Sequence, residues 1–286
     1  MMNQILSEDT FKAFSDSIKI GLVATIDDQM EPHITVLATL QGKDKKTMML
    51  GKFVEGLSKQ FIQDRPKTGF LIMNPQKEFW YGKMNYTHLL KDGDDYIMYN
   101  NQPLYRYNTY FGINTVYYFD LVEISDKFIL PMGSIIKNAI KVVLRKKKFI
   151  DKQNQNVMKP WASKFTSKMD TLKFLAYIDK SGYPQIIPVI QGQSVGSSRF
   201  VITNEPYKER LNTLEKGQKI AIFAFSMTME SVLLKGTFSG FQDTRYGYLD
   251  IERVYNSMPP VHGYIYPETP RDEVLFSEND NVLNSI

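Results

Sequence analysis

Few side chains in this sequence have the types and spacing that catalysis or metal binding needs. Its only histidines are His33, His88 and His262, and no two of them share a metal-ligand spacing. It has no cysteine, which excludes disulfides, thiolate metal sites and cysteine nucleophiles. A glycine-rich nucleotide loop is also missing. The one Gly-x-Ser-x-Gly run, Gly192–Gly196, lies between two predicted strands and not between a strand and a helix, so it does not form a nucleophile elbow. We therefore expect no metal site and neither Rossmann nor hydrolase chemistry.

Two segments instead place cations at the start of a helix that follows a strand. The first runs from Met49 to Lys59 and the second from Val201 to Arg210. Free backbone amides, a hydroxyl and a cation at a helix start can hold a phosphate, because the N–H groups and the charge both favour an anion. Taken alone, each lysine is more simply explained as a solvated surface charge. Their matching places in a repeat favour the phosphate site.

That repeat is visible near the start of each half. Ala24 to Ile34 and Ala176 to Ile186 are identical at five of eleven positions, without a gap and at an offset of 152. The residues around both stretches have the same kind of pattern. We infer a duplication. His33 corresponds to Gln185, so a function shared by both copies does not need an imidazole there, and a structural role is the simpler interpretation of His33.

Each copy is predicted to consist of short strands and one helix. The strands are expected near Ile20–Ile26, Ile34–Leu40, Thr47–Gly51, Thr68–Met73, Phe79–Tyr86 and Thr115–Glu123, and then near Leu172–Ile178, Ile186–Gly192, Arg199–Thr203, Lys219–Phe225 and Ser231–Phe241. The helices are expected near Val54–Gln63 and Pro206–Leu214. Short antiparallel strands in series usually close into a barrel or sandwich. The predicted fold class is therefore mainly β, with two small barrels and a few helices.

A basic amphipathic helix is predicted between the copies. The segment from Lys127 to Ile150 holds seven bases and no acid. Its apolar face consists of Ile135, Ile136, Ala139, Ile140 and Val143, and its basic face of Lys137, Lys141, Arg145 and Lys148. We interpret it as a linker that packs on a barrel. Contact with an anionic membrane surface or an acidic partner is the alternative.

An aromatic stretch from Tyr96 to Gly112 occurs in copy one alone. It contains five tyrosines together with Arg106 and Phe111, a composition that suits a planar ring with polar edges. Tyrosines that fill a barrel rim are the alternative. We expect Arg106 and Tyr107 to lie over a crevice between the barrels, and Trp80 to lie on a strand beside it.

The order and spacing of these motifs resemble the pyridoxamine 5′-phosphate oxidase-like, FMN-binding split β-barrel family. The resemblance rests on the Ala-x-Ile-Asp and Pro-x-Ile hairpins, the strand, loop and lysine-bearing helix, and the strand Val232–Gly236. It covers about residues 20–123 and 171–241. It implies two tandem split β-barrel domains that form a pseudo-dimer, with FMN bound non-covalently in the crevice between them. We place the domains at residues 1–130 and 161–286, joined by a basic helical linker at 131–160.

The resemblance also implies FMN contacts at matching positions of the two copies. These are Thr35, Val36 and Leu37 with Ile187, Pro188 and Val189 on the second strands, Leu50 and Gly51 with Thr203 and Asn204 on the third strands, and Ser58 and Lys59 with Lys208 and Arg210 for the phosphate. The second strands lack the basic residues of the oxidases proper, and the substrate-phosphate residues are also missing. Pyridoxamine phosphate oxidation is therefore not expected, and the loss of flavin from one of the two sites is left open.

Composition indicates a globular protein, with 43% hydrophobic and 23% charged residues. The net charge of +4 is concentrated in the predicted linker, so we expect no nucleic-acid partner. The N-terminus lacks a basic start followed by an apolar core, and no apolar run approaches the roughly 20 residues that span a bilayer. We expect a cytoplasmic protein with no membrane partner.

The sequence thus favours an FMN-binding flavoprotein that acts as an oxidoreductase on a small-molecule substrate. In such proteins the cofactor supplies the redox chemistry, so a missing acid–base pair is no objection. A non-catalytic module that binds flavin, haem or another phosphorylated ligand is the alternative. Whether two chains pair as a homodimer, in addition to the internal pairing, is left open.

Overall fold

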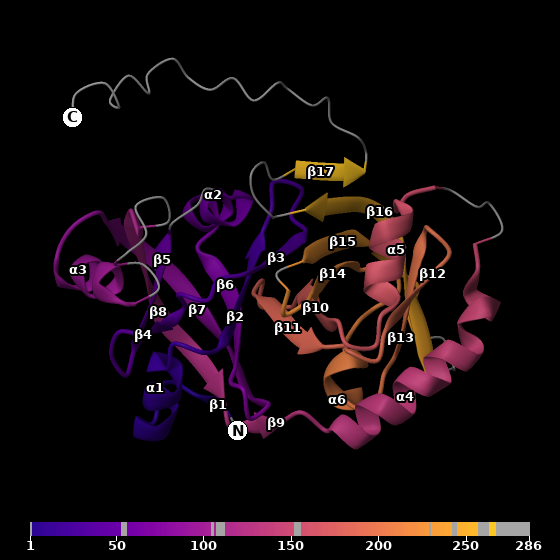
Figure 1. Cartoon of the computed structure of the whole chain (residues 1–286), viewed down its shortest axis with the longest axis horizontal. Helices are drawn as coiled ribbons and strands as arrows, with labels where there is room; N and C mark the ends of the chain where they lie inside the picture. The colour runs from indigo at the N-terminus through magenta and orange to yellow at the C-terminus, as the bar shows by residue number, and fades with distance from the viewer. Residues whose placement is uncertain are drawn as a thin grey trace, which may run out of the picture.

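The computed structural model of the chain describes residues 2–52, 56–103, 106, 112–151, 156–228, 230–241, 245–256 and 263–266. Two antiparallel sheets dominate these residues and lie side by side, one from each half of the chain (Figure 1). We call the half that contains the first sheet the first barrel and the half that contains the second sheet the second barrel.

The first sheet has the strand order β3-β2-β6-β7-β8-β5-β4, with β1 paired to β8 and β9 to β7. Its strands are β1 (Met2–Asn3), β2 (Ile20–Ile26), β3 (Pro32–Val36), β4 (Gln41–Gly42), β5 (Thr47–Lys52), β6 (Lys67–Met73), β7 (Glu78–Leu90), β8 (Thr115–Ser125) and β9 (Phe128–Ile129).

The second sheet has the equivalent order β11-β10-β14-β15-β16-β13-β12, with β17 paired to β16. Its strands are β10 (Leu172–Ile178), β11 (Pro184–Pro188), β12 (Gln193–Val195), β13 (Arg199–Thr203), β14 (Lys219–Phe225), β15 (Ser231–Phe238), β16 (Tyr246–Asn256) and β17 (Gly263–Tyr266). Both ends of β2, β3 and β6 recur 152 residues later in β10, β11 and β14. The predicted fold class, two tandem β-barrels in one chain, is confirmed.

Two strand predictions were too long for the same reason in both copies. β3 ends at Val36, because the chain turns there and Leu40 N–H donates to the carbonyl of Leu37. β11 ends at Pro188, and Gly192 N–H donates to Val189 in the equivalent turn. The apolar residues that follow each strand therefore belong to a buried turn and not to the strand.

The helices lie around the two sheets. They are α1 (Glu8–Ser15), α2 (Leu57–Asp64), α3 (Asp94–Asn101), α4 (Met132–Arg145), the 3-10 helix η1 (Lys146–Phe149), α5 (Pro160–Ser167) and α6 (Lys208–Leu211). α2 begins at Leu57, later than the predicted Val54, and α6 has four residues where a longer helix was expected. No helix in the described part of the chain is long and apolar enough to cross a membrane.

The linker helix α4 packs on β12 and β13 of the second barrel with a narrower face than predicted. Val142 is buried there against Val195 and Val201, and Ala139 is also buried. Ile135 is instead buried among residues of both barrels. Ile136 and Ile140, which were expected to belong to the packed face, are about half exposed, at 49% and 52%. The sequence pattern identified the helix correctly. The side of the helix that was expected to pack on the barrel was wrong.

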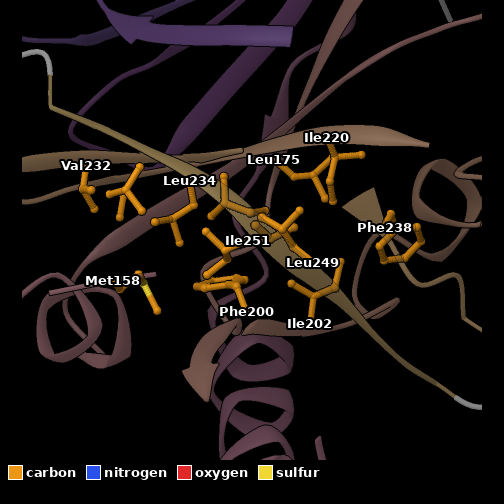
Figure 2. Packing of buried hydrophobic residues seen from close by; sticks show 14 of the residues in the cluster. Met158, Leu175, Phe200, Ile202, Ile220, Val232, Leu234, Phe238, Leu249 and Ile251 are labelled. Carbon is orange, nitrogen blue, oxygen red and sulfur yellow. The ribbon is translucent and has the colours of Figure 1, made fainter. Parts of the chain in front are cut away.

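Each barrel has its own apolar core. In the second barrel, Phe200 and Ile202 of β13 meet Leu234 of β15 and Leu249 of β16 (Figure 2). In the first barrel the equivalent space is filled around Leu50, Phe70 and Trp80. A third cluster combines side chains of both barrels, including Ala24, Phe79, Ala176 and Phe223. The barrels therefore share a continuous apolar interface.

One glycine shows how closely the barrels approach each other. A Cβ at Gly69 on β6 would lie 2.0 Å from the carbonyl oxygen of Pro184 on β11. No side chain fits in that space, so the backbones of the two barrels can meet here only at glycine.

Two ion pairs cross the interface at equivalent positions of the repeat. Asp27 of the first barrel binds Lys235 of the second, and Asp179 of the second binds Lys83 of the first at 3.0 Å. Both aspartates also order their own hairpins, since Asp27 Oδ1 accepts from Glu31 N–H and Asp179 Oδ1 accepts from Tyr183 N–H. The aspartate of the repeat motif therefore both shapes a turn and binds the other barrel.

We expect the Asp27 pair to contribute more to stability than the Asp179 pair. The side chain of Lys235 is fully buried, and its second acidic neighbour, Glu31, is 4.0 Å away and is held by Arg253. The side chain of Lys83 is 16% exposed and keeps a second carboxylate, Glu123, at 2.8 Å. Asp27→Asn leaves an ammonium buried and should cost about 3 to 5 kcal/mol, whereas Asp179→Asn should cost about 1 kcal/mol, nearer the value of an exposed pair. Urea unfolding of both variants measures this difference, and equal losses would contradict it.

Stability should also depend on pH through the two aspartates. Burial alone raises the pKa of Asp27, but Lys235 and backbone hydrogen bonds outweigh it and lower the pKa. Ser181 and Lys83 likewise outweigh burial and lower the pKa of Asp179. Carboxylates with depressed folded-state pKa values stabilise the fold above the unfolded value of about 3.9, and this stabilisation is lost as the pH falls through the folded-state pKa.

We therefore expect the urea midpoint to fall steeply below about pH 4. Asp179→Asn, which has one aspartate fewer to protonate, should show a shallower fall. The same slope in this variant and in the unmodified chain would exclude Asp179 as a source of the pH dependence.

Candidate functional site

The interface creates two equivalent places where a helix start meets the opposite barrel. In one, α2 and β3 of the first barrel lie near β16 of the second. In the other, α6 and β11 of the second barrel lie near β7 of the first. Figure 1 shows α2 at the upper edge and α6 at the lower edge of the molecule. We call them the α2 site and the α6 site, and Ser58 and Arg210 take the same position in the two helices.

Arg210 is the central side chain of the α6 site. Its guanidinium lies over the ring of Tyr81 from β7, 3.6 Å from the centroid, and Nη2 donates to the carbonyl of Ile186 at 2.8 Å. Nη1 is buried and has no hydrogen-bond partner. Within the described residues no carboxylate pairs with this guanidinium, and burial lowers the pKa of Arg210. The α6 site therefore holds a buried cation without a counter-ion.

Three neighbouring side chains of the second barrel also have an unsatisfied buried atom. Tyr207 OH, Asn204 Oδ1 and Gln191 Oε1 have no hydrogen-bond partner. Tyr207 packs its ring edge-on against Phe79 at 6.2 Å, and burial raises its pKa. Gln191 Nε2 donates to the carbonyls of Thr203 and Glu205, which holds the loop before α6. Two donors and two acceptors near this loop are therefore left unused.

The α2 site has different side chains. Ser58 and Lys59 are buried on α2, and a Cβ at Gly56 would lie 3.6 Å from Lys59 Nζ. The lysine thus folds back over the start of its own helix, and its role as a phosphate ligand stays a prediction. Thr39 is the counterpart of Gln191; its hydroxyl donates to the carbonyl of Gly51, and its backbone carbonyl accepts from Tyr99 OH. The loop before α2 includes residues 53–55, which lie outside the described part.

The other predicted site residues are not all brought together. On the second strands, Val36 packs on the shared interface, and Thr35 is largely buried. Leu37, Leu50 and Val189 point into the barrel cores, and Ile187 does the same. Of the other predicted positions, Pro188, Thr203 and Asn204 are buried. Lys208 and Arg106 are exposed, and Tyr107 lies outside the described residues.

The expectation that Trp80 lies beside the crevice was wrong, because the adjacent residue, Tyr81, faces the second barrel instead. Trp80 points into the core of the first barrel, where its ring meets Phe14 edge-on at 5.5 Å. Successive side chains of a strand face opposite sides, so its neighbours Phe79 and Tyr81 face the second barrel. Tyr81 is the residue that sequence reasoning missed. Strand alternation alone could have found it once the facing side was known.

The aromatic stretch does not cover the crevice in the part that the structure describes. Its first residues form the end of α3, and Tyr99 packs against Met49, Ile113 and Val116 on the outside of the first sheet. This small cluster completes the first barrel. Residues 104, 105 and 107–111 of the stretch lie outside the described part, so the expectation for Tyr107 stays a prediction.

Neither a protein-family model nor a curated protein matches the chain. Similar solved structures include an FMN-binding protein from Syntrophomonas wolfei, with 18% identity over 42% of this chain and 82% of that chain and a TM-score of 0.33. A putative pyridoxamine 5′-phosphate oxidase from Lactobacillus delbrueckii has 14% identity over 43% and 96% of the two chains, with a TM-score of 0.35. HupZ from Group A Streptococcus has 14% identity over 42% and 91%, also with a TM-score of 0.35.

The solved structures that resemble this chain thus include the group that the sequence motifs indicated. Each of these matches covers less than half of this chain and most of the solved chain. Their likeness to this chain is one of fold.

The placement of Trp80 predicts a purely structural role for it. Trp80→Ala should lower the free energy of unfolding by about 3 to 5 kcal/mol, because it removes a buried aromatic ring from the core of the first barrel. Urea unfolding measures the loss. Tyr81→Ala serves as the comparison, because Tyr81 is the next residue on β7 and its side chain lies on the opposite face, against Arg210. A smaller loss for Trp80→Ala than for Tyr81→Ala would contradict the assignment of Trp80 to the core.

Proposed function

We propose that the chain binds a flavin phosphate, with FMN as the expected cofactor, at the α6 site and uses it as an oxidoreductase on a small molecule. The unpaired buried guanidinium of Arg210 is the observation that carries this proposal. The choice of flavin among phosphorylated ligands rests on the sequence motifs that resemble the FMN-binding split β-barrel family.

A phosphate is the partner that Arg210 lacks. A cation that is taken out of water without a counter-ion costs considerable free energy, and proteins usually pair such charges. A guanidinium presents several donors in one plane, which suits the oxygens of a phosphate. Nη2 is already held by Ile186, and this contact fixes the direction of the group while Nη1 remains unused.

The nearby unsatisfied atoms extend the match to the rest of the ligand. Tyr207 OH is a second unused donor that suits a phosphate oxygen. Asn204 Oδ1 and Gln191 Oε1 are acceptors, which suit the hydroxyls of a ribityl chain. Tyr81 and Phe79 stack on Phe128, and Tyr81 also lies against the guanidinium, so these rings position the cation. The polar groups at this site thus fit the phosphate and the hydroxyl chain of a phosphorylated ligand.

Binding at Arg210 requires a local change. Nη1 has no accessible surface, so a ligand reaches it only after a neighbouring side chain moves. We assign this movement to Tyr207, which caps α6, packs at the interface and makes no hydrogen bond through its hydroxyl. Its displacement costs packing but no hydrogen bond through that hydroxyl.

The chain's own groups would bind, orient and shield the cofactor. A bound flavin supplies electron or hydride transfer. Arg210 and Tyr207 hold the negative end, and the apolar interface around Phe79 and Phe223 excludes water. Because each wall of the site comes from a different barrel, one chain supplies both sides of the crevice.

Arg210→Met tests the proposal, because it should weaken FMN binding without lowering the stability of the ligand-free protein. The variant removes a buried unpaired charge and keeps an apolar stem, so the ligand-free protein should unfold at the same or a higher urea concentration. FMN affinity should fall at least about tenfold, since a hydrogen bond to a charged group contributes about 1.5 to 3 kcal/mol. Absorbance and fluorescence titration with FMN measure the affinity.

Two variants serve as comparisons in the same titration. Lys216→Met removes an exposed charge from the turn after α6 and should leave the affinity unchanged. Lys59→Ala changes the α2 site and should have little effect. A tenfold loss in Lys59→Ala with none in Arg210→Met would move the phosphate to the α2 site. Unchanged affinity and lower stability in Arg210→Met would show that Arg210 is a packing residue.

The catalytic part of the proposal needs a separate measurement. Bound FMN should be reduced by a nicotinamide or chemical donor and reoxidised over repeated turnovers by a small-molecule acceptor. Flavin that binds tightly but undergoes no turnover with any tested acceptor would instead support the non-catalytic binding module.

A further inference from the structure

A cavity of about 790 Å³ lies on the second barrel, away from both interface sites. It is open to solvent and is lined by η1, by α5 and by the turn that joins β12 to β13. Figure 1 shows α5 and β12 on the side of the second barrel that faces away from the first. Its volume is within the range of pockets that hold small molecules.

Four lysines and no acidic residue line the cavity. They are Lys146, Lys147, Lys159 and Lys164. Among the described residues, Lys147 and Lys164 form no ion pair. Lys146 Nζ donates to Gln193 Oε1 at 3.0 Å, a neutral partner, and burial lowers the pKa of Lys146. Lys147 and Lys164 therefore give the cavity a positive charge that no acidic residue of its described lining balances.

A further buried lysine adds to this field. Lys173 is fully buried, and its ammonium donates only to backbone carbonyls in the described structure, those of Lys168 and Ile190. Burial lowers the pKa of Lys173 to about 8; the charge of Asp170 opposes this lowering, and the like charge of Lys146 adds a smaller one. Like charges gathered in a low-dielectric wall attract an anion more strongly than the same lysines would on an open surface.

The remainder of the lining is largely apolar. Ile150, Val157, Met158 and Val195 contribute to it, and the last three are almost fully buried. Ser163 Oγ is already used, since it donates to the carbonyl of Gly196 at 2.8 Å. Attraction for a negative head group is thus combined with a surface that favours a hydrocarbon body.

We propose that this cavity binds a small amphipathic anion, with a carboxylate or phosphate head group against Lys147 and Lys164 and an apolar body against Met158 and Val195. Charge complementarity selects the head group, and the apolar lining selects the body. The site is separate from Arg210 and does not depend on the proposed flavin chemistry.

Decanoate is a suitable probe, and its binding to the full chain can be followed by titration calorimetry below the concentration at which it forms micelles. We expect saturable binding of one decanoate per chain. Lys147→Gln with Lys164→Gln should weaken it at least about tenfold, because two charge-assisted contacts are lost. Lys12→Gln with Lys91→Gln, which removes two exposed charges from the first barrel, is the matched control and should bind decanoate normally.

Two further probes separate the contributions of charge and chain. Decyltrimethylammonium has the same hydrocarbon chain with the opposite charge and should not bind, and inorganic phosphate alone should bind more weakly than decanoate. Equal decanoate affinity in the two double variants, equal affinity for decyltrimethylammonium, or equal affinity for phosphate would each overturn the proposal. FMN affinity should be unchanged in the Lys147 and Lys164 variant, and its loss would show that the cavity is the flavin site instead.

Discussion

The two ion pairs that join the repeat aspartates to the opposite barrel are the contacts on which the arrangement depends. Asp27 with Lys235 and Asp179 with Lys83 occupy the same positions in the two copies, so the barrels face each other through a pseudo-twofold relation. The apolar cluster between the pairs provides burial but little direction, because hydrophobic attraction is nonspecific. The charged groups, together with the close approach at Gly69, fix the register. Both candidate interface sites exist only while that register holds.

Joining the two barrels in one chain allows the two sites to differ. In a dimer of identical subunits, any change to one crevice appears in the other. Here Arg210 occupies the position of Ser58, and Gln191 occupies that of Thr39. The Thr39 hydroxyl donates to Gly51, whereas Gln191 and Arg210 each retain an unused buried atom. Among the described residues, four buried polar atoms without a hydrogen-bond partner lie around the α6 site, which supports a functional difference between the copies.

Much of the fold was predictable, because the repeat and the strand pattern are local properties of the sequence. β2, β10, β13 and β14 have the predicted bounds, and the duplicated strand order follows from the offset of 152. The direction of individual side chains was not predictable in the same way. Trp80 and Tyr81 are both aromatic, so the pattern does not show which of them faces the core. The lack of a counter-ion for Arg210 depends on contacts between distant segments, which no local pattern contains.

The presence of Arg210 at this buried position is best explained by a conflict between the stability of the ligand-free protein and the binding of a phosphate. An apolar side chain at this position would leave no buried charge unpaired, and natural chains usually keep such a charge only where a partner compensates for it. A ligand that binds the folded state alone adds stability that rises with its concentration. A phosphate at Arg210 would therefore compensate for the cost of the unpaired cation whenever the ligand is present. On this view the unpaired charge of Arg210 is a feature of the ligand-free protein alone, and the guanidinium gains its counter-ion only in the complex.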